Sequence, residues 1–142
     1  MVVTFDIDPD ELFHPDKLKK LLANEDRIAE LASSGVDGVV VLPFTREFAA
    51  FGPTEFLERM FASHAPAFLH VGTDFRFGAQ ASGGVPELEA WAKTVGVELC
   101  AHELKTEDGV PITATRIRRL LAEAELDEAN RLLGEPYRLR GI

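Results

Sequence analysis

The 142-residue sequence contains one cysteine, one tyrosine and one tryptophan, and it has no long apolar run. Without a second cysteine the chain has no internal disulfide, and we expect Cys100, in the apolar stretch VELCAH, to be a buried, unreactive thiol. No apolar segment approaches the roughly 18 residues that a membrane-spanning helix needs. No charged-then-apolar signal segment opens the sequence either, so we expect a cytoplasmic protein with no membrane partner.

Positive charge is also scarce. Lys and Arg number 15 against 24 Asp and Glu, which gives a net charge of −9 and argues against a nucleic-acid surface. The arginines that exist gather near 116–119 and 131–140, a pattern that suits a small anionic ligand. Neither G-x-G-x-x-G nor G-x-x-x-x-G-K-[ST] occurs. No metal site is expected, because no two histidines are paired at ligand spacing; they are His14, His64, His70 and His102.

Apolar segments and helix-forming segments alternate along the chain. Four short apolar runs are typical of strands: 2–5, 38–44, 67–72 and 97–102. Helix signals lie between them, with Asn24 as a cap, Pro53 near a helix start and Gly35 after a helix end. The alternation predicts right-handed βαβ units, an α/β fold with a parallel sheet, and one domain over residues 1–142.

Ligands of parallel sheets bind beyond the carboxyl ends of the strands, and unusual residues follow several of these ends. The stretch GVPITATRIRRLL (109–121) reads as the start of a helix that Thr113 caps. Its unpaired first-turn N–H groups, the Thr115 hydroxyl, Arg116 and Arg118 then form an anion site. The alternative is a capped surface helix with exposed arginines.

Two further loops carry candidate residues. In VGTDFRFG (71–78), Phe75 and Phe77 form either a platform for a flat aromatic ligand or a cover that folds back onto the core. In FDIDPDELFHP (5–15), acidic residues such as Asp6 either hold a divalent cation or make a turn with solvated acids; the missing calcium-loop spacing favours the turn.

Five stretches in this order resemble one known family. VVTFD…P…LFHP, VLPFTREFA, VGTDFRFG, ITATRIR and LLGEPYRLRG are similar to the adenylyltransferase domain of bacterial bifunctional riboflavin kinase/FAD synthetases. The likeness runs from Val2 to Gly141. It implies a Rossmann-like nucleotidyltransferase fold, a parallel sheet with helices on both faces, and transfer of AMP from ATP to FMN with Mg²⁺, which yields FAD and pyrophosphate.

The resemblance also implies roles for particular residues. The flavin would lie against Pro9, Phe13, Asp74, Phe75 and Phe77. The ATP phosphates would be held by a second set, of which Thr115 and Arg118 are the expected catalytic residues: Thr113, Thr115, Arg116 and Arg118.

The sequence departs from this family in ways that bear on activity. The H-x-G-H signature of the family's first βα unit is absent, and S-S-T is replaced by TAT at 113–115. We therefore expect the first βα unit to be missing, the 142 residues alone to make no FAD, and exposed strand edges to favour self-association. One alternative is a non-catalytic flavin- or nucleotide-binding or interaction module descended from the family. Another is a nucleotidyltransferase for a smaller acceptor, which the phenylalanine-rich loop disfavours.

Overall fold

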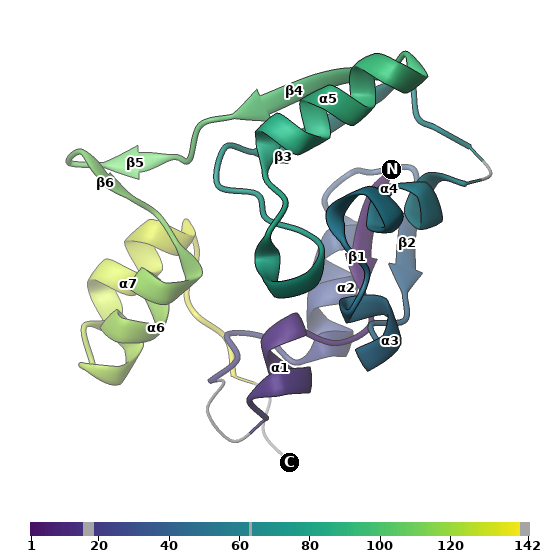
Figure 1. The fold of residues 1–142 in the computed structure, drawn as a ribbon. Helices are drawn as coiled ribbons and strands as arrows, with labels where there is room; N and C mark the ends of the chain where they lie inside the picture. Colours follow the sequence, from purple (N-terminus) through teal and green to yellow (C-terminus); the bar gives the residue numbers. More distant parts are fainter. Residues whose placement is uncertain (16–18, 63, 140–142) are drawn as a thin grey trace. The chain divides into compact units, whose positions relative to one another are not determined.

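A computed structural model describes residues 1–15, 19–62 and 64–139 of the chain. It divides into two compact units, which are described separately. Unit 1 comprises residues 1–44 and 105–142, and unit 2 comprises residues 45–104. Figure 1 shows the course of the chain through both.

Unit 1 begins with a parallel strand pair. In β1 (Val2–Phe5) and β2 (Val39–Leu42), Val2 lies opposite Val39 and Phe5 lies opposite Leu42. Consecutive β-branched valines favour the extended backbone of both strands. Directly after β1, the Asp6 carboxylate accepts a hydrogen bond from the Phe44 N–H at 2.8 Å. Asp6 therefore ties together the two strand ends at which the sequence predicts ligand binding.

Two helices lie between β1 and β2 along the chain. The five-residue α1 (Pro9–Phe13), capped by the Asp8 carboxylate, lies where the sequence analysis expects a loop, because so short a helix has no readable period. In α2 (Asn24–Ser33) the predicted cap is wrong by one position. Ala23 is the N-cap, and the Asn24 amide instead donates to Glu11 at 3.2 Å. Gly35, at φ 84°, follows the helix end as predicted.

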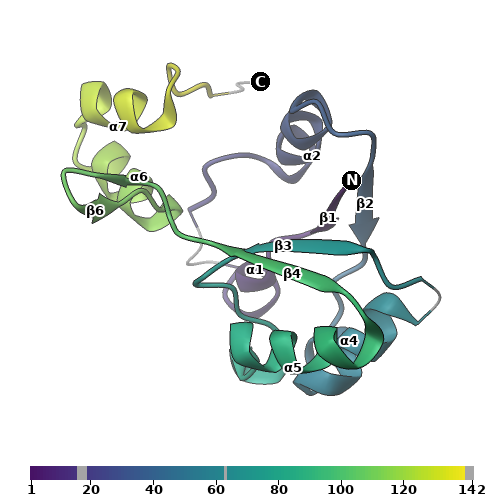
Figure 2. The same cartoon turned by 90° about the horizontal axis from the view of Figure 1, so that it is seen from above.

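The rest of unit 1 is a hairpin and a pair of helices. β5 (Thr106–Glu107) and β6 (Val110–Pro111) pair antiparallel around Asp108 and Gly109, both at positive φ, as the Asp-Gly sequence favours. The helices α6 (Ala114–Ala122) and α7 (Leu126–Leu133) lie side by side in both Figure 1 and Figure 2.

A small apolar core joins α6 to α7. The buried residues are Ile117, Leu120, Ala129 and Leu132. Leu21, Ile112 and Leu121 pack against this cluster and are partly buried. Ile117, Leu120 and Leu121 are at the i, i+3 and i+4 positions of α6, a spacing that predicts an apolar face buried against a neighbouring element. The partner is α7, whose own apolar face is presented at helical spacing.

Unit 2 is a parallel strand pair with helices on one face. β3 (Phe68–Gly72) pairs with β4 (Glu98–His102), and Figure 2 shows α4 (Pro53–Phe61) and α5 (Val85–Val95) together on one side of them. The short α3 (Arg46–Ala49) and a 3₁₀ turn (Ala79–Ala81) complete the unit. Its core consists of Phe56, Leu57, Phe77, Leu88, Ala92 and Val97.

The predicted α/β class with parallel strands is confirmed, and the four predicted strands lie within a residue or two of their expected bounds. In the described residues these strands form two separate two-stranded sheets, and no further strand bonds to either. Cys100 is half-buried on β4 and not buried as expected. Self-association through the strand edges stays a prediction.

Candidate functional site

The start of α6 has the geometry that the sequence predicts. Thr113 is the N-cap, and its hydroxyl oxygen accepts a hydrogen bond from the Arg116 N–H at 3.1 Å. The N–H groups of the first helical turn have no partner within the helix, and the positive end of the helix dipole lies there. Thr115 in this turn is exposed. The helix start therefore presents N–H and hydroxyl donors that suit an anion.

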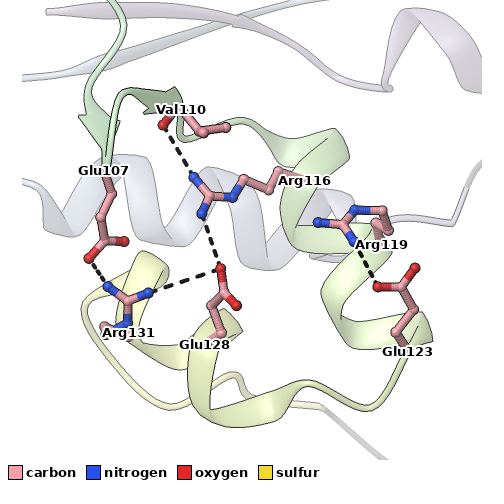
Figure 3. Close-up of polar contacts among 7 residues, drawn as sticks. All are labelled: Glu107, Val110, Arg116, Arg119, Glu123, Glu128 and Arg131. Atoms are coloured by element: carbon pink, nitrogen blue, oxygen red, sulfur yellow. Dashed lines mark hydrogen bonds and ion pairs between the residues drawn. The ribbon is translucent and has the colours of Figure 1, made fainter.

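The Arg116 side chain points into the fold and not toward an anion at the helix start (Figure 3). Its guanidinium donates to the Val110 carbonyl at 3.2 Å and to the Glu128 carboxylate at 3.0 Å. The side chain is only 14% exposed, so a large part of its charge is offset by Glu128. Glu128 also lies 4.0 Å from Arg131, which pairs with Glu107 on the hairpin. Arg116 therefore belongs to a network that joins α6, α7 and the β5–β6 hairpin.

The other two arginines of α6 differ from Arg116 and from each other. Arg119 is 59% exposed and pairs with Glu123 one turn along the helix at 2.8 Å, so its side chain points to solvent. Arg118 is half-buried, and its Nε donates to the Lys19 carbonyl at 2.8 Å. Its two terminal nitrogens have no further partner among the described residues. Arg118 is thus anchored at one nitrogen with donors left to offer.

The aromatic loop of unit 2 contains a buried and a half-buried phenylalanine. Phe77 is 5% exposed and packs on Phe56 of α4, with 5.4 Å between ring centroids. Phe75 stacks on Phe77 at 5.6 Å with the rings 21° apart. Phe77 therefore fills the core beneath the loop, the structural alternative that the sequence left open. Of the three flavin-binding residues predicted in this loop, the half-buried Phe75 and the exposed Asp74 still offer a surface to a ligand.

The remaining candidates lie on α1 in unit 1. Pro9 and Phe13 are four residues apart and so share one face of this helix, and Phe13 is 48% exposed. The acids around them already have partners within the chain. The pKa of Glu11 is lowered chiefly by hydrogen bonds from Lys20 and then Asn24. Asp6 and Asp8 accept backbone N–H groups, as the turn interpretation predicts.

One pair of polar residues in unit 2 has no counterpart in the sequence analysis. His70 of β3 and His102 of β4 lie with Nδ1 and Nε2 2.8 Å apart. The two residues are 32 positions apart in the chain, so sequence spacing does not pair them. Parallel pairing of the two predicted strands could have indicated this contact. A His in the middle of one strand and a His at the end of its neighbour can lie close together on one face of a sheet.

Comparison with known proteins identifies the family of this chain. The model of the FAD synthetase family matches residues 1–116. The chain belongs to the FAD synthetase family. The match includes Thr113, Thr115 and Arg116 but ends before Arg118.

Sequence identity to curated relatives also supports membership of the FAD synthetase family. The chain is 36% identical to the bifunctional riboflavin kinase/FMN adenylyltransferase of Escherichia coli K12 over 143 residues, which cover 99% of the chain and 46% of that protein. The enzyme of the same name from Pseudomonas fluorescens is 33% identical over 99% of the chain and 45% of its own length. The one from Listeria monocytogenes is 31% identical over the same shares. The chain thus spans about half the length of these relatives.

The fold of this FAD synthetase family member is also found in a solved structure. A crystal structure described as a macrolide-efflux protein from Streptococcus pneumoniae superposes with a TM-score of 0.80. It is 25% identical, and the match covers 96% of this chain and 45% of that one. This agreement confirms the nucleotidyltransferase-like α/β fold. Within the described parts of the chain, no helix is long and apolar enough to cross a bilayer.

Proposed function

We propose that this member of the FAD synthetase family provides the flavin- and nucleotide-binding part of an FMN adenylyltransferase. In that reaction a phosphate oxygen of FMN attacks the α-phosphorus of ATP, and the bond from that phosphorus to pyrophosphate breaks. The observation that carries the proposal is the start of α6, where a Thr113 cap leaves first-turn donors open beside Thr115. Family membership and the FMN adenylyltransferase activity named for the relatives support it.

The residues of α6 would act by positioning and by charge. Phosphoryl-group transfer asks little covalent chemistry of the protein and depends on alignment and on offsetting negative charge. First-turn N–H groups and the Thr115 hydroxyl would donate to phosphate oxygens, and the terminal nitrogens of Arg118 would add a charge-assisted contact. Arg116 would contribute to this site indirectly, because its ion pair with Glu128 holds α6 against α7.

Each unit, taken by itself, has an exposed face with predicted flavin-binding residues. Pro9 and Phe13 form one apolar face on α1. In unit 2, Phe75 has a ring partly open to solvent and a firm base in Phe77, so an isoalloxazine ring would stack on it without disturbing the core. The exposed Asp74 carboxylate next to it would accept hydrogen bonds from ring N–H groups or ribityl hydroxyls.

The described residues do not by themselves form a magnesium site. Among the described residues, no three His, Cys, Asp or Glu side chains are arranged to hold a metal ion. Mg²⁺ commonly binds through substrate phosphates with few protein ligands, so we propose that it enters as part of the nucleotide substrate.

A second function is favoured by two observations. The 142 residues contain no H-x-G-H, and Arg116 is occupied by Glu128. Both reduce the positive charge and the donors available to the transition state, and one lost preorganised donor commonly costs about 3 kcal/mol. The second candidate is therefore a module that binds flavin or nucleotide without making FAD.

Calorimetric titration of the 142-residue chain with ATP tests the site, with two arginine variants as a matched pair. Arg118→Ala should weaken ATP binding by roughly 1.5–3 kcal/mol, as for a lost hydrogen bond to a charged group. Arg119→Ala should change it by less than about 0.5 kcal/mol, as for an exposed position. Equal losses would indicate diffuse electrostatics, and no loss in either would return α6 to a capped surface helix.

Two assays on the same protein separate the enzyme from the binding module. FMN fluorescence should be quenched when the flavin stacks on the protein, and Phe75→Ala should abolish most of that quenching. Incubation with FMN, ATP and Mg²⁺ should yield no FAD above a no-protein control. Steady FAD production would contradict the expected inactivity and remove the second candidate.

A further inference from the structure

An exposed pair of histidines lies on unit 2, and neither of them is assigned to a substrate. The distance from Nδ1 of His70 to Nε2 of His102 is 2.8 Å, and the rings stack with centroids 5.1 Å apart and 16° between planes. Both residues are exposed. Two exposed imidazole rings gain little stability from stacking alone. Their close contact therefore suggests a role in binding a ligand.

The strand register gives the pair an open, polar setting. His70 is opposite Cys100, and His102 is opposite Gly72, so all four positions are on one face of the β3–β4 pair. Leu69 and Leu99 alternate to the opposite face, where Leu99 lies beside Ala92 and Val97 in the hollow lined by α5. The histidines thus occupy the face that α4 and α5 leave uncovered within unit 2 (Figure 2).

A carboxylate lies on the same face. A Cβ placed on Gly72 would be 2.6 Å from Oδ1 of Asp74, so that oxygen occupies the space where a side chain at position 72 would project. Since Gly72 is the register partner of His102, the Asp74 carboxylate lies on the same face as the histidine pair. The face therefore offers two imidazole nitrogens and a nearby oxygen.

We propose that His70 and His102 bind a divalent transition-metal ion of the zinc and nickel class. Two nitrogens each about 2.0–2.1 Å from a tetrahedral zinc ion are about 3.3 Å apart, so the pair needs to open by only about half an ångström. Imidazole suits Zn²⁺, Ni²⁺ and Cu²⁺, whereas Mg²⁺ and Ca²⁺ prefer oxygen ligands. This inference does not rest on the proposed adenylyltransferase function.

The site is bidentate in protein nitrogen. No three His, Cys, Asp or Glu side chains of the described residues already converge on one point, so water or the Asp74 carboxylate completes the coordination. The proton shared between the rings moves to the other nitrogen of its own ring when the metal binds.

Titration of the full 142-residue chain with NiCl₂ and with ZnCl₂ at pH 7.5, followed by calorimetry, tests the site. One ion per chain should bind, and excess MgCl₂ should not displace it. His70→Gln and His102→Gln should each weaken binding at least about tenfold, because the second ligand of a chelate acts at high effective concentration. His64→Gln, an exposed histidine elsewhere in unit 2, should change affinity less than about twofold.

Three outcomes would overturn the proposal. They are no nickel or zinc binding, wild-type affinity in both His70→Gln and His102→Gln, and loss of binding in Cys100→Ser with both histidines intact. The last would identify a thiol site instead. Circular dichroism of each variant checks that the fold is retained, and proton NMR of the imidazole C–H signals shows directly whether His70 and His102 respond to the added ion.

Discussion

The α6–α7 region of unit 1 and the aromatic loop of unit 2 use motif residues in parallel ways. In each, one residue that a sequence motif assigns to ligand binding is taken up by the fold: Arg116 by an ion pair with Glu128, and Phe77 by the core around Phe56. In each, a neighbour two positions away keeps an accessible group. Arg118 retains unpartnered donors among the described residues, and Phe75 stays half-buried.

The two regions differ in the interaction through which the motif residue stabilises the fold. Phe77 is buried apolar surface, whose loss leaves a cavity, while Arg116 is a partly buried charge whose value depends on its partner. Motif residues at a binding site thus serve as support as well as contact. Mutations that separate the two roles give the sharpest tests.

The largest effect is expected from the aromatic loop. Phe77→Ala should lower the free energy of unfolding by about 3–5 kcal/mol, because a buried ring is replaced by a cavity. Phe75→Ala should cost roughly 1–2 kcal/mol, since its ring is already partly exposed. Urea unfolding followed by fluorescence of Trp91, which lies in α5 of the same unit, measures both. Similar losses in the two variants would contradict the assignment of Phe77 as support and Phe75 as surface.

The arginine network should show a smaller effect. Arg116→Ala should destabilise the protein by about 1–2 kcal/mol, because it leaves Glu128 without its main partner and Val110 without a donor. Arg119→Ala should cost less than about 0.5 kcal/mol, as for an exposed pair. Urea unfolding followed by far-UV circular dichroism compares them. If Arg119→Ala were the more damaging variant, the network would not be what holds α6.

Helix ends in unit 1 offer a stabilising change. Ala124 follows α6 at φ 62°, whereas Gly134 follows α7 at φ 80°. A left-handed backbone conformation is strained for alanine and unstrained for glycine. Ala124→Gly should therefore raise the free energy of unfolding by about 0.5–1 kcal/mol. The matched reversal, Gly134→Ala, should lower it by about 1 kcal/mol. Thermal unfolding midpoints that shift in the opposite directions would refute this reading of the two helix ends.

The smallest expected effect concerns pH and the start of α5. Glu87 accepts the Gly84 N–H at 2.8 Å, and this hydrogen bond, with the Glu87 N–H and nearby Arg76, lowers the pKa of the Glu87 carboxyl. A lowered folded-state pKa stabilises the fold above the ordinary glutamate range, and the gain is lost as pH falls through the folded pKa. Glu87→Gln should therefore lower the melting temperature more at pH 7 than at pH 3.

The matched control for that change is Glu89→Gln, an exposed position two residues along the same helix. It should leave the melting temperature nearly unchanged at both pH values. A pH dependence in Glu89→Gln equal to that in Glu87→Gln would mean that general helix charge is responsible and that the contact with Gly84 is not.

Much of this protein was set by local sequence. The strands at 2–5, 39–42, 68–72 and 98–102 follow from short β-branched and apolar runs, and the Thr113 cap follows from one hydroxyl before a helical stripe. The resemblance to FAD synthetases rested on contiguous motifs and is confirmed. Signals of this kind lie within a few residues of each other, so the sequence contains them in full.

Tertiary structure decided which side chains remain available. That Arg116 pairs with Glu128 and that Phe77 packs on Phe56 depend on segments that meet only after folding. The same holds for His70 and His102, which a parallel register brings together across 32 positions. Burial and charge pairing are properties of neighbours in space, and for these residues the neighbours are distant in the chain. For that reason contiguous motifs indicated the family and a capping hydroxyl indicated the helix start, whereas packing determined the division between support and surface.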